Sequence, residues 1–345
     1  MDNNLKMSAV VRAGKDNMPL WLAYLSIAAA YVGTSAQGIP RGYYFDKYKP
    51  LLNASPEKYA YLPVIAPILY ELDNNSKYVN DIVIVGKKEK LEPALERIID
   101  SIEKPIQIIE SDGKMHENMI KGGEAAEIPG HKIYVDADTP LVLGEEIDKS
   151  VEQCVRFEDG KPVFDHTHYQ FFISEETLHN GLPSLERVYL RLIPDGRLKT
   201  DRDKRFENEN GAYGFKETNL IILDEKKGGI KGLSDIYSIR IGVNPVTWFK
   251  TAGLLIEKGM AGYGYALAKD LFIHKTGTTS QMEEFLSKFA GMDIHIVESP
   301  FARFSFDIDE RGDMGILLKE KEYVNRAHKM LNKLYGAKVI ERLDL

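Results

Sequence analysis

Short β-branched runs alternate with helical patterns through the first half of the chain. Each run is almost continuously apolar, which is typical of strands buried on both faces of a parallel sheet. The runs are residues 8–12, 81–85, 106–110 and 132–136. Parallel strands need crossover connections, and helices supply them in right-handed units. The pattern predicts an α/β fold with a doubly wound, mostly parallel mixed sheet that binds ligands at the carboxyl ends of its strands.

Segments with helical spacing separate these runs. The clearest is 89–102, which places Leu91, Leu95 and Ile98 on one face, and 116–126 and 144–154 are the next candidates. In the second half we expect strands at 163–174, 187–193, 219–223, 293–297 and 302–306. We expect helices at about 245–272, at 279–289 and at 320–335, with Gly336 ending the last one.

Composition limits the class of protein. The 345 residues are 43% hydrophobic and carry a net charge of −7, so the chain can bury a large core but lacks the basic face that nucleic acid requires. A single cysteine, Cys154, argues against a disulfide framework and fits a reducing compartment. The apolar segment 20–32 is shorter than the roughly 20 residues of a spanning helix. We expect it to be a core helix, with membrane contact or a lipid-like ligand as the alternative, and we expect a cytoplasmic protein without a signal peptide.

Cations and a glycine follow the first predicted strand, as Arg12, Ala13, Gly14 and Lys15. Backbone N–H groups and cationic side chains in such a loop can hold phosphates. A further lysine, Lys49, precedes a proline-stiffened apolar turn. By itself such a lysine is more typical of solvated surface than of a binding site.

Acidic residues follow two of the predicted strands. Asp136 and Asp138 end the strand at 132–136, and Thr139-Pro140 turns the chain directly afterwards. Asp307 and Asp309 follow the predicted strand at 302–306, where alternation would place them on one face. Paired carboxylates form a hard oxygen site suited to Mg²⁺, and the alternative role for each pair is to cap a following helix.

Together these clusters resemble the nucleotidyltransferases of the GT-A-like Rossmann fold, in particular MobA-like NTP transferases and cytidylyltransferases. The segment 8–15 resembles the opening strand and glycine-rich loop of that family, although only Gly14 represents its glycines. Residues 49–52 resemble a Pro-Lys-Pro-Leu-Leu element with tyrosine in place of the first proline. Residues 79–86 resemble the strand after the first long helix, 136–142 the metal-binding turn, and 306–314 the closing acidic segment.

The resemblance implies a fold, a reaction and a set of residue roles. The fold would be the nucleotide-diphospho-sugar-transferase variant of the Rossmann fold. A domain over 1–318 would carry an acceptor-side insertion at 155–225 and a helical elaboration at 245–290, followed by a C-terminal helix at 319–345. The reaction would move an NMP group from an NTP to a small phosphorylated acceptor and release pyrophosphate. Asp138 and Asp309 would bind Mg²⁺, and Asp136 and Asp307 would lie behind these ligands and tune the electric field at the ion. The remaining implied roles are phosphate binding and catalysis by Arg12, Lys15 and Lys49, and nucleotide binding by Ala13, Gly14, Gly113 and Asn118.

Two other functions remain open at this stage. Asp136-Ala137-Asp138 is also the Asp-x-Asp pattern of glycosyltransferases that use a nucleotide sugar, and the sparse glycines leave room for a nucleotide-binding protein without catalysis.

Overall fold

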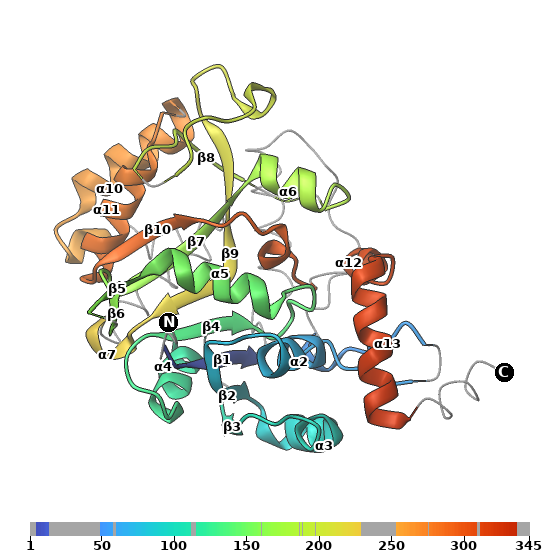
Figure 1. Cartoon of the computed structure of the whole chain (residues 1–345). Helices are drawn as coiled ribbons and strands as arrows, with labels where there is room; N and C mark the ends of the chain where they lie inside the picture. The colour runs from blue at the N-terminus through green and yellow to red at the C-terminus, as the bar shows by residue number, and fades with distance from the viewer. Residues whose placement is uncertain are drawn as a thin grey trace. The chain divides into compact units, whose positions relative to one another are not determined.

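A computed structural model of the chain is shown in Figure 1. Its described residues divide into two compact units, the first within 5–13, 49–165 and 303–336 and the second within 166–302. The structure describes residues 5–13, 49–57, 60–111, 115–159, 161–185, 187, 189–196, 198–228, 253–274, 276–308 and 311–336. In this described part, no helix has the length and apolar character needed to cross a membrane.

Four parallel strands form the sheet of the first unit, in the order β4-β1-β2-β3. They are β1 (Met7–Ala13), β2 (Val79–Gly86), β3 (Ile106–Glu110) and β4 (Lys132–Asp136). All residues of β1 and β4 are buried, which is why their sequences are apolar on both faces. The four strands predicted for the first half of the chain are confirmed.

Helices connect these strands. They are α2 (Ala66–Asn74), α3 (Lys88–Ile99), α4 (Met115–Ala125) and α5 (Gly144–Cys154). On α3 the predicted apolar face is buried at Leu91, Leu95 and Ile98. α4 packs tightly on the sheet at Gly122, where an added Cβ would lie 2.3 Å from the Val10 side chain and 2.9 Å from that of Val85. Only glycine permits this close approach.

The remaining elements of the first unit are a short hairpin and the C-terminal helices. The hairpin joins β5 (Val155–Glu158) to β6 (Lys161–Phe164) in antiparallel fashion. The 3-10 turn η1 (Lys49–Leu51) follows β1 in the described part, and α12 (Arg311–Leu317) and α13 (Lys321–Tyr335) close it. α13 buries Tyr323, Ala327 and Met330 and ends at Gly336, where φ is 81°.

The second unit has its own strands and helices. β10 (Ile294–Glu298) pairs in parallel with β7 (His168–Ser174), which is antiparallel to β9 (Tyr213–Leu223), and β8 (Leu190–Leu192) joins the other edge of β9. Its helical elements are α6 (Glu175–Gly181), η2 (Lys204–Phe206), α7 (Glu225–Gly228), α10 (Ala261–Ala268), the π-helical η3 (Lys269–His274) and α11 (Thr279–Ala290). The prediction of an α/β fold with a mixed, mostly parallel sheet is confirmed.

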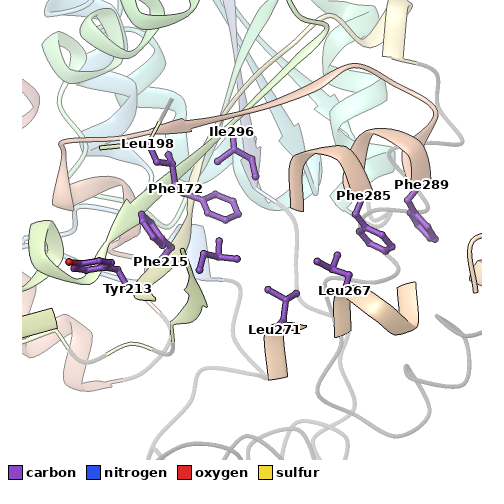
Figure 2. Close-up of a cluster of buried hydrophobic side chains, with 10 residues drawn as sticks. Phe172, Leu198, Tyr213, Phe215, Leu267, Leu271, Phe285, Phe289 and Ile296 are labelled. Carbon is purple, nitrogen blue, oxygen red and sulfur yellow. The ribbon is translucent and has the colours of Figure 1, made fainter. Parts of the chain in front are cut away.

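The core of the second unit lies between strands and the α10–α11 region (Figure 2). Phe285 and Phe289 of α11 stack with ring centroids 5.8 Å apart. The strands contribute Phe172, Phe215 and Ile296, and Leu267 and Leu271 come from α10 and η3. α11 begins at a capping box in which Thr278 and Gln281 exchange hydrogen bonds, so its predicted N-terminus is well defined.

Part of the predicted secondary structure is wrong. Residues 302–306 form the 3-10 turn η4 (Ala302–Ser305) instead of a strand. Phe304 and Phe306 are fully buried, and a buried apolar run reads the same in either conformation. Strand alternation therefore gives no reason to place Asp307 and Asp309 on one face.

The strand predicted over 163–174 is broken between β6 and β7, where the backbone N–H of His166 donates to the Tyr169 hydroxyl. The predicted segments 20–32 and 245–252 lie outside the described residues.

Gly144, the first residue of α5, provides a test of this packing. An added Cβ would lie 2.6 Å from the Asn75 carbonyl carbon and from the Glu71 backbone oxygen, so α2 or α5 would have to move. We expect Gly144→Ala to lower the free energy of unfolding by about 1–3 kcal/mol, measured by urea denaturation. In Gly315→Ala, at an exposed position of α12, the Cβ meets nothing within 4 Å. That control should gain up to about 1 kcal/mol from helix propensity, and equal effects in the two variants would contradict the packing argument.

Candidate functional site

The candidate site of the first unit begins where β1 and β4 end. Arg12 and Asp136 are register partners on these neighbouring strands, so their side chains leave the sheet on the same side. Arg12 Nε lies 2.9 Å from Asp136 Oδ1, and the two side chains are 2% and 11% exposed. Arg12 Nη1 also donates to Met119 Sδ of α4 at 3.5 Å. These two strand ends are therefore joined by a buried ion pair.

The chain turns directly after this pair. The Ala137 N–H donates to the Arg12 carbonyl at 3.1 Å and extends the ladder by one residue. The Thr139 hydroxyl donates to the Asp136 carbonyl at 2.6 Å, and the Val142 N–H donates to the Thr139 carbonyl. Asp138 consequently lies at the corner of a hydrogen-bonded turn at the end of the strand.

Lys49 lies beside this corner. Its Nζ is 3.7 Å from Asp138 Oδ2, and the side chains of Lys49 and Asp138 are 14% and 19% exposed. η1 holds the lysine in place, because the Leu52 N–H donates to the Lys49 carbonyl and the Ile65 N–H donates to the Pro50 carbonyl. The site thus combines a partly accessible cation and a partly accessible carboxylate.

The C-terminal acidic segment meets the same turn. The backbone N–H of Ile308 donates to the Asp138 carbonyl at 3.0 Å, which places Asp307 next to the residue bonded to the turn. Asp307 is half-buried. Two acidic segments that lie far apart in the sequence are therefore adjacent in the folded unit.

The other predicted site residues are placed as follows. Ala13 is buried at the end of β1. Asn118 on α4 is 1% exposed, and its Oδ1 has no hydrogen-bond partner in the described part of the chain. It neighbours Met119, the residue that contacts Arg12. Gly14, Lys15, Gly113 and Asp309 lie outside the described residues.

The chemistry of the donor set fits a magnesium ion bound together with phosphates. No group of three or more His, Cys, Asp or Glu that could hold a metal occurs among the residues described. Mg²⁺ in phosphate-transfer sites needs only one or two carboxylates, because phosphate oxygens and waters supply its other ligands. Asp138 and Asp307 offer such oxygens on adjoining segments, whereas Asp136 is engaged by Arg12.

Two charged side chains that support the Asp138 turn are absent from the sequence-based prediction. They are Glu71 of α2 and Arg326 of α13, an ion pair at 2.9 Å. The available signal was the position of Arg326, three residues after buried Tyr323 and one before buried Ala327 on an otherwise apolar helix face. A charged residue in such a stripe requires a buried partner.

Comparisons with known proteins bear on the fold. No family model and no curated protein matches the chain. A solved structure described as a hypothetical transferase from Thermus thermophilus is similar with a TM-score of 0.55 and 16% identity, covering 90% of this chain and all 100% of that one. A CMP:2-keto-3-deoxy-manno-octonic acid synthetase complexed with CTP reaches a TM-score of 0.47 at 12% identity, covering 94% of this chain and 99% of that one. An inositol-1-phosphate CTP transferase from T. maritima reaches 0.42 at 12% identity, covering 94% and 96%. We draw nothing from the last two, whose scores are low. The first similarity shows that this chain shares the α/β fold of the Thermus protein.

Proposed function

We propose that the chain is a nucleotidyltransferase that moves an NMP group from an NTP to a small phosphorylated acceptor. The observation that carries the proposal is the joining of Lys49, Asp138 and the Asp307 segment at the carboxyl ends of parallel strands. Ligands of doubly wound sheets bind at this edge. The resemblance of the surrounding motifs to MobA-like NTP transferases and cytidylyltransferases supports the same reaction and the GT-A-like variant of the fold.

The reaction makes one bond and breaks one. An oxygen of the acceptor phosphate forms a bond to the α-phosphorus, while the bond from that phosphorus to the bridging oxygen breaks and pyrophosphate leaves. Negative charge accumulates on the phosphate oxygens, so positioning and electrostatic stabilisation dominate catalysis. Lys49 supplies positive charge at the α-phosphate in this proposal, and its contact with Asp138 orients the ammonium group.

Asp138 and Asp309 would hold Mg²⁺ in this site, with Asp307, which lies on the segment adjoining the Asp138 turn, behind them. Bound there, Mg²⁺ would neutralise phosphate oxygens and orient the triphosphate. We assign Asp136 a supporting role, because its carboxylate is paired with Arg12. With its side chain 2% exposed, Arg12 fits the role of holding Asp136, and phosphate contact would require that ion pair to open. Lys15 remains the proposed second phosphate cation, and Ala13, Gly14, Gly113 and Asn118 the proposed nucleotide-binding residues.

The pairing of Asp136 argues against the glycosyltransferase alternative. An Asp-x-Asp site relies on both carboxylates to hold the metal of a nucleotide sugar, and here one of the two forms a buried ion pair. The acceptor-side insertion at 155–225, the cytoplasmic location and the absence of nucleic-acid and membrane partners stay predictions.

A nucleotide screen tests the proposal. We expect one of CTP, GTP, UTP and ATP to raise the thermal midpoint of unfolding only when Mg²⁺ is present. At a nucleotide concentration of 100 times its Kd, the free energy of unfolding should rise by about 2.7 kcal/mol. Pyrophosphate release should then follow with a phosphorylated acceptor from a panel. Release of a nucleoside diphosphate from a nucleotide sugar would replace the proposal with glycosyl transfer. Binding without turnover across the panel would favour a nucleotide-binding protein, and no binding would remove the proposal.

A further inference from the structure

Arg326 of α13 contacts the backbone immediately after the Asp138 corner. Its side chain is 12% exposed, and its guanidinium points both Nη groups at consecutive peptide units. Arginine presents five N–H donors in a rigid planar fork, so it can hold several carbonyl groups in one fixed geometry. The accepting carbonyl oxygens belong to Pro140 (Nη2, 3.2 Å), Leu141 (Nη2, 3.3 Å) and Val142 (Nη1, 3.2 Å).

Glu71 fixes the arginine from the opposite side. Its side chain is 2% exposed, and its Oε1 accepts from Arg326 Nη1 at 2.9 Å. The second oxygen, Oε2, accepts from the backbone N–H of Gly144 at 3.0 Å and from the side chain of Asn75 at 2.9 Å. The carboxylate therefore orients the guanidinium and also the first residue of α5, where the turn ends.

α13 also reaches the segment that carries Lys49, the proposed catalytic lysine. Tyr323, one helical turn before Arg326, donates its hydroxyl to the Ala54 carbonyl at 2.6 Å. Tyr335 donates to the Tyr61 carbonyl, and Tyr61 donates to the Leu51 carbonyl, two residues after Lys49. One helix thus holds the chain around both members of the Lys49–Asp138 pair.

We infer that Arg326 is a positioning residue. It binds the carbonyl groups of residues 140–142, fixes the turn that carries Asp138, and thereby holds the Asp138 carboxylate beside Lys49. The expected effect of Arg326 on turnover rests on the proposed function, whereas its effect on the turn does not. Helix attachment alone does not account for the contacts, since a well-packed apolar pair secures two helices at least as well as a buried ion pair. Orientation of three carbonyl oxygens instead requires a multidentate donor.

Arg326→Lys separates the ion pair with Glu71 from the binding of the three carbonyl groups. Lysine keeps the positive charge that faces Glu71 but has a single nitrogen in place of the planar guanidinium. We expect the variant to fold, to need about 10-fold more Mg²⁺ for half-maximal pyrophosphate release, and to lose about 10-fold in kcat, as for other partners behind metal ligands. Amide hydrogen exchange of residues 138–143, measured without nucleotide or metal, should become about 10-fold faster. Should the lysine variant fail to fold, the double variant Arg326→Gln with Glu71→Gln, which leaves no buried charge without its partner, undergoes the same measurements.

Asp148→Asn is the matched control. Asp148 is a buried carboxylate of the same unit that accepts from the Ser76 hydroxyl at 2.7 Å and from the Lys77 N–H at 2.8 Å, two contacts that do not involve Arg326 or residues 138–143. This control should lose stability without a change in Mg²⁺ requirement. Equal Mg²⁺ requirements in the two variants, or unchanged exchange at 138–143, would overturn the inference. If the unaltered protein releases no pyrophosphate at all, the proposed function fails, and the exchange measurement still decides whether Arg326 fixes the turn.

Discussion

Replacing Asp138 with asparagine should reduce metal-dependent pyrophosphate release on the order of 10³-fold while leaving the protein folded. Asparagine has the same shape but carries no charge, so it cannot balance Mg²⁺ or the Lys49 ammonium. The lost contact with Lys49 is long, at 3.7 Å, and both side chains are partly accessible, so stability should change by about 1 kcal/mol or less. Single-turnover assays over a range of Mg²⁺ concentrations measure the first effect, and thermal unfolding measures the second.

An exposed aspartate elsewhere in the first unit supplies the comparison for Asp138→Asn. Asp100 follows α3 and is exposed, so Asp100→Asn should leave both turnover and unfolding unchanged. Full turnover in Asp138→Asn would remove the carboxylate from the reaction and with it the central residue of the proposed site.

Replacing Arg12 with methionine should produce the largest loss of stability, about 3–5 kcal/mol. Methionine fills much of the volume of arginine but leaves the Asp136 carboxylate, 11% exposed, without its cation. Removing one partner of a buried ion pair costs more than removing both, because the remaining charge stays desolvated. Urea denaturation of the single variants and the double variant measures this difference.

The double variant Arg12→Met with Asp136→Asn makes the test specific. It should recover more than half of the loss, because no uncompensated carboxylate remains. Additive losses in the two single variants would mean that the residues stabilise the protein independently, and the joining of β1 to β4 by this ion pair would then be wrong.

Much of the fold was predictable because burial imposes a simple pattern. β3, β4 and α5 have the predicted bounds, since their strand or helix periodicity is uninterrupted. The wrong prediction of a strand at η4 arises because burial there gives no distinctive periodicity. Ala302 and Phe304 are buried in a 3-10 turn and Phe306 is buried directly after it, and their sequence contains no feature that distinguishes this turn from a buried strand.

The candidate site was predictable in composition but less so in its contacts. The sequence indicated Arg12 and Asp136 as separate groups, whereas their pairing follows from the register of β1 against β4, a property of the folded sheet. The place of Arg326 in an apolar stripe indicates a buried partner, but not that three of its acceptors are backbone carbonyl groups, which carry no residue-type signal. Contacts made by backbone atoms are the part of a site that residue types reveal least.

The hydrogen bond from Ile308 to Asp138 has a consequence for synthesis on the ribosome. The chain grows from its N-terminus, so β1 to β4 can pair before the segment that carries Asp307 and Ile308 has left the exit tunnel. A nascent chain halted at α5 would possess the lysine and the first carboxylates but not their later neighbours. The arrangement at the Asp138 turn would then be completed only after Ile308 has emerged, well after the first parallel strands have formed.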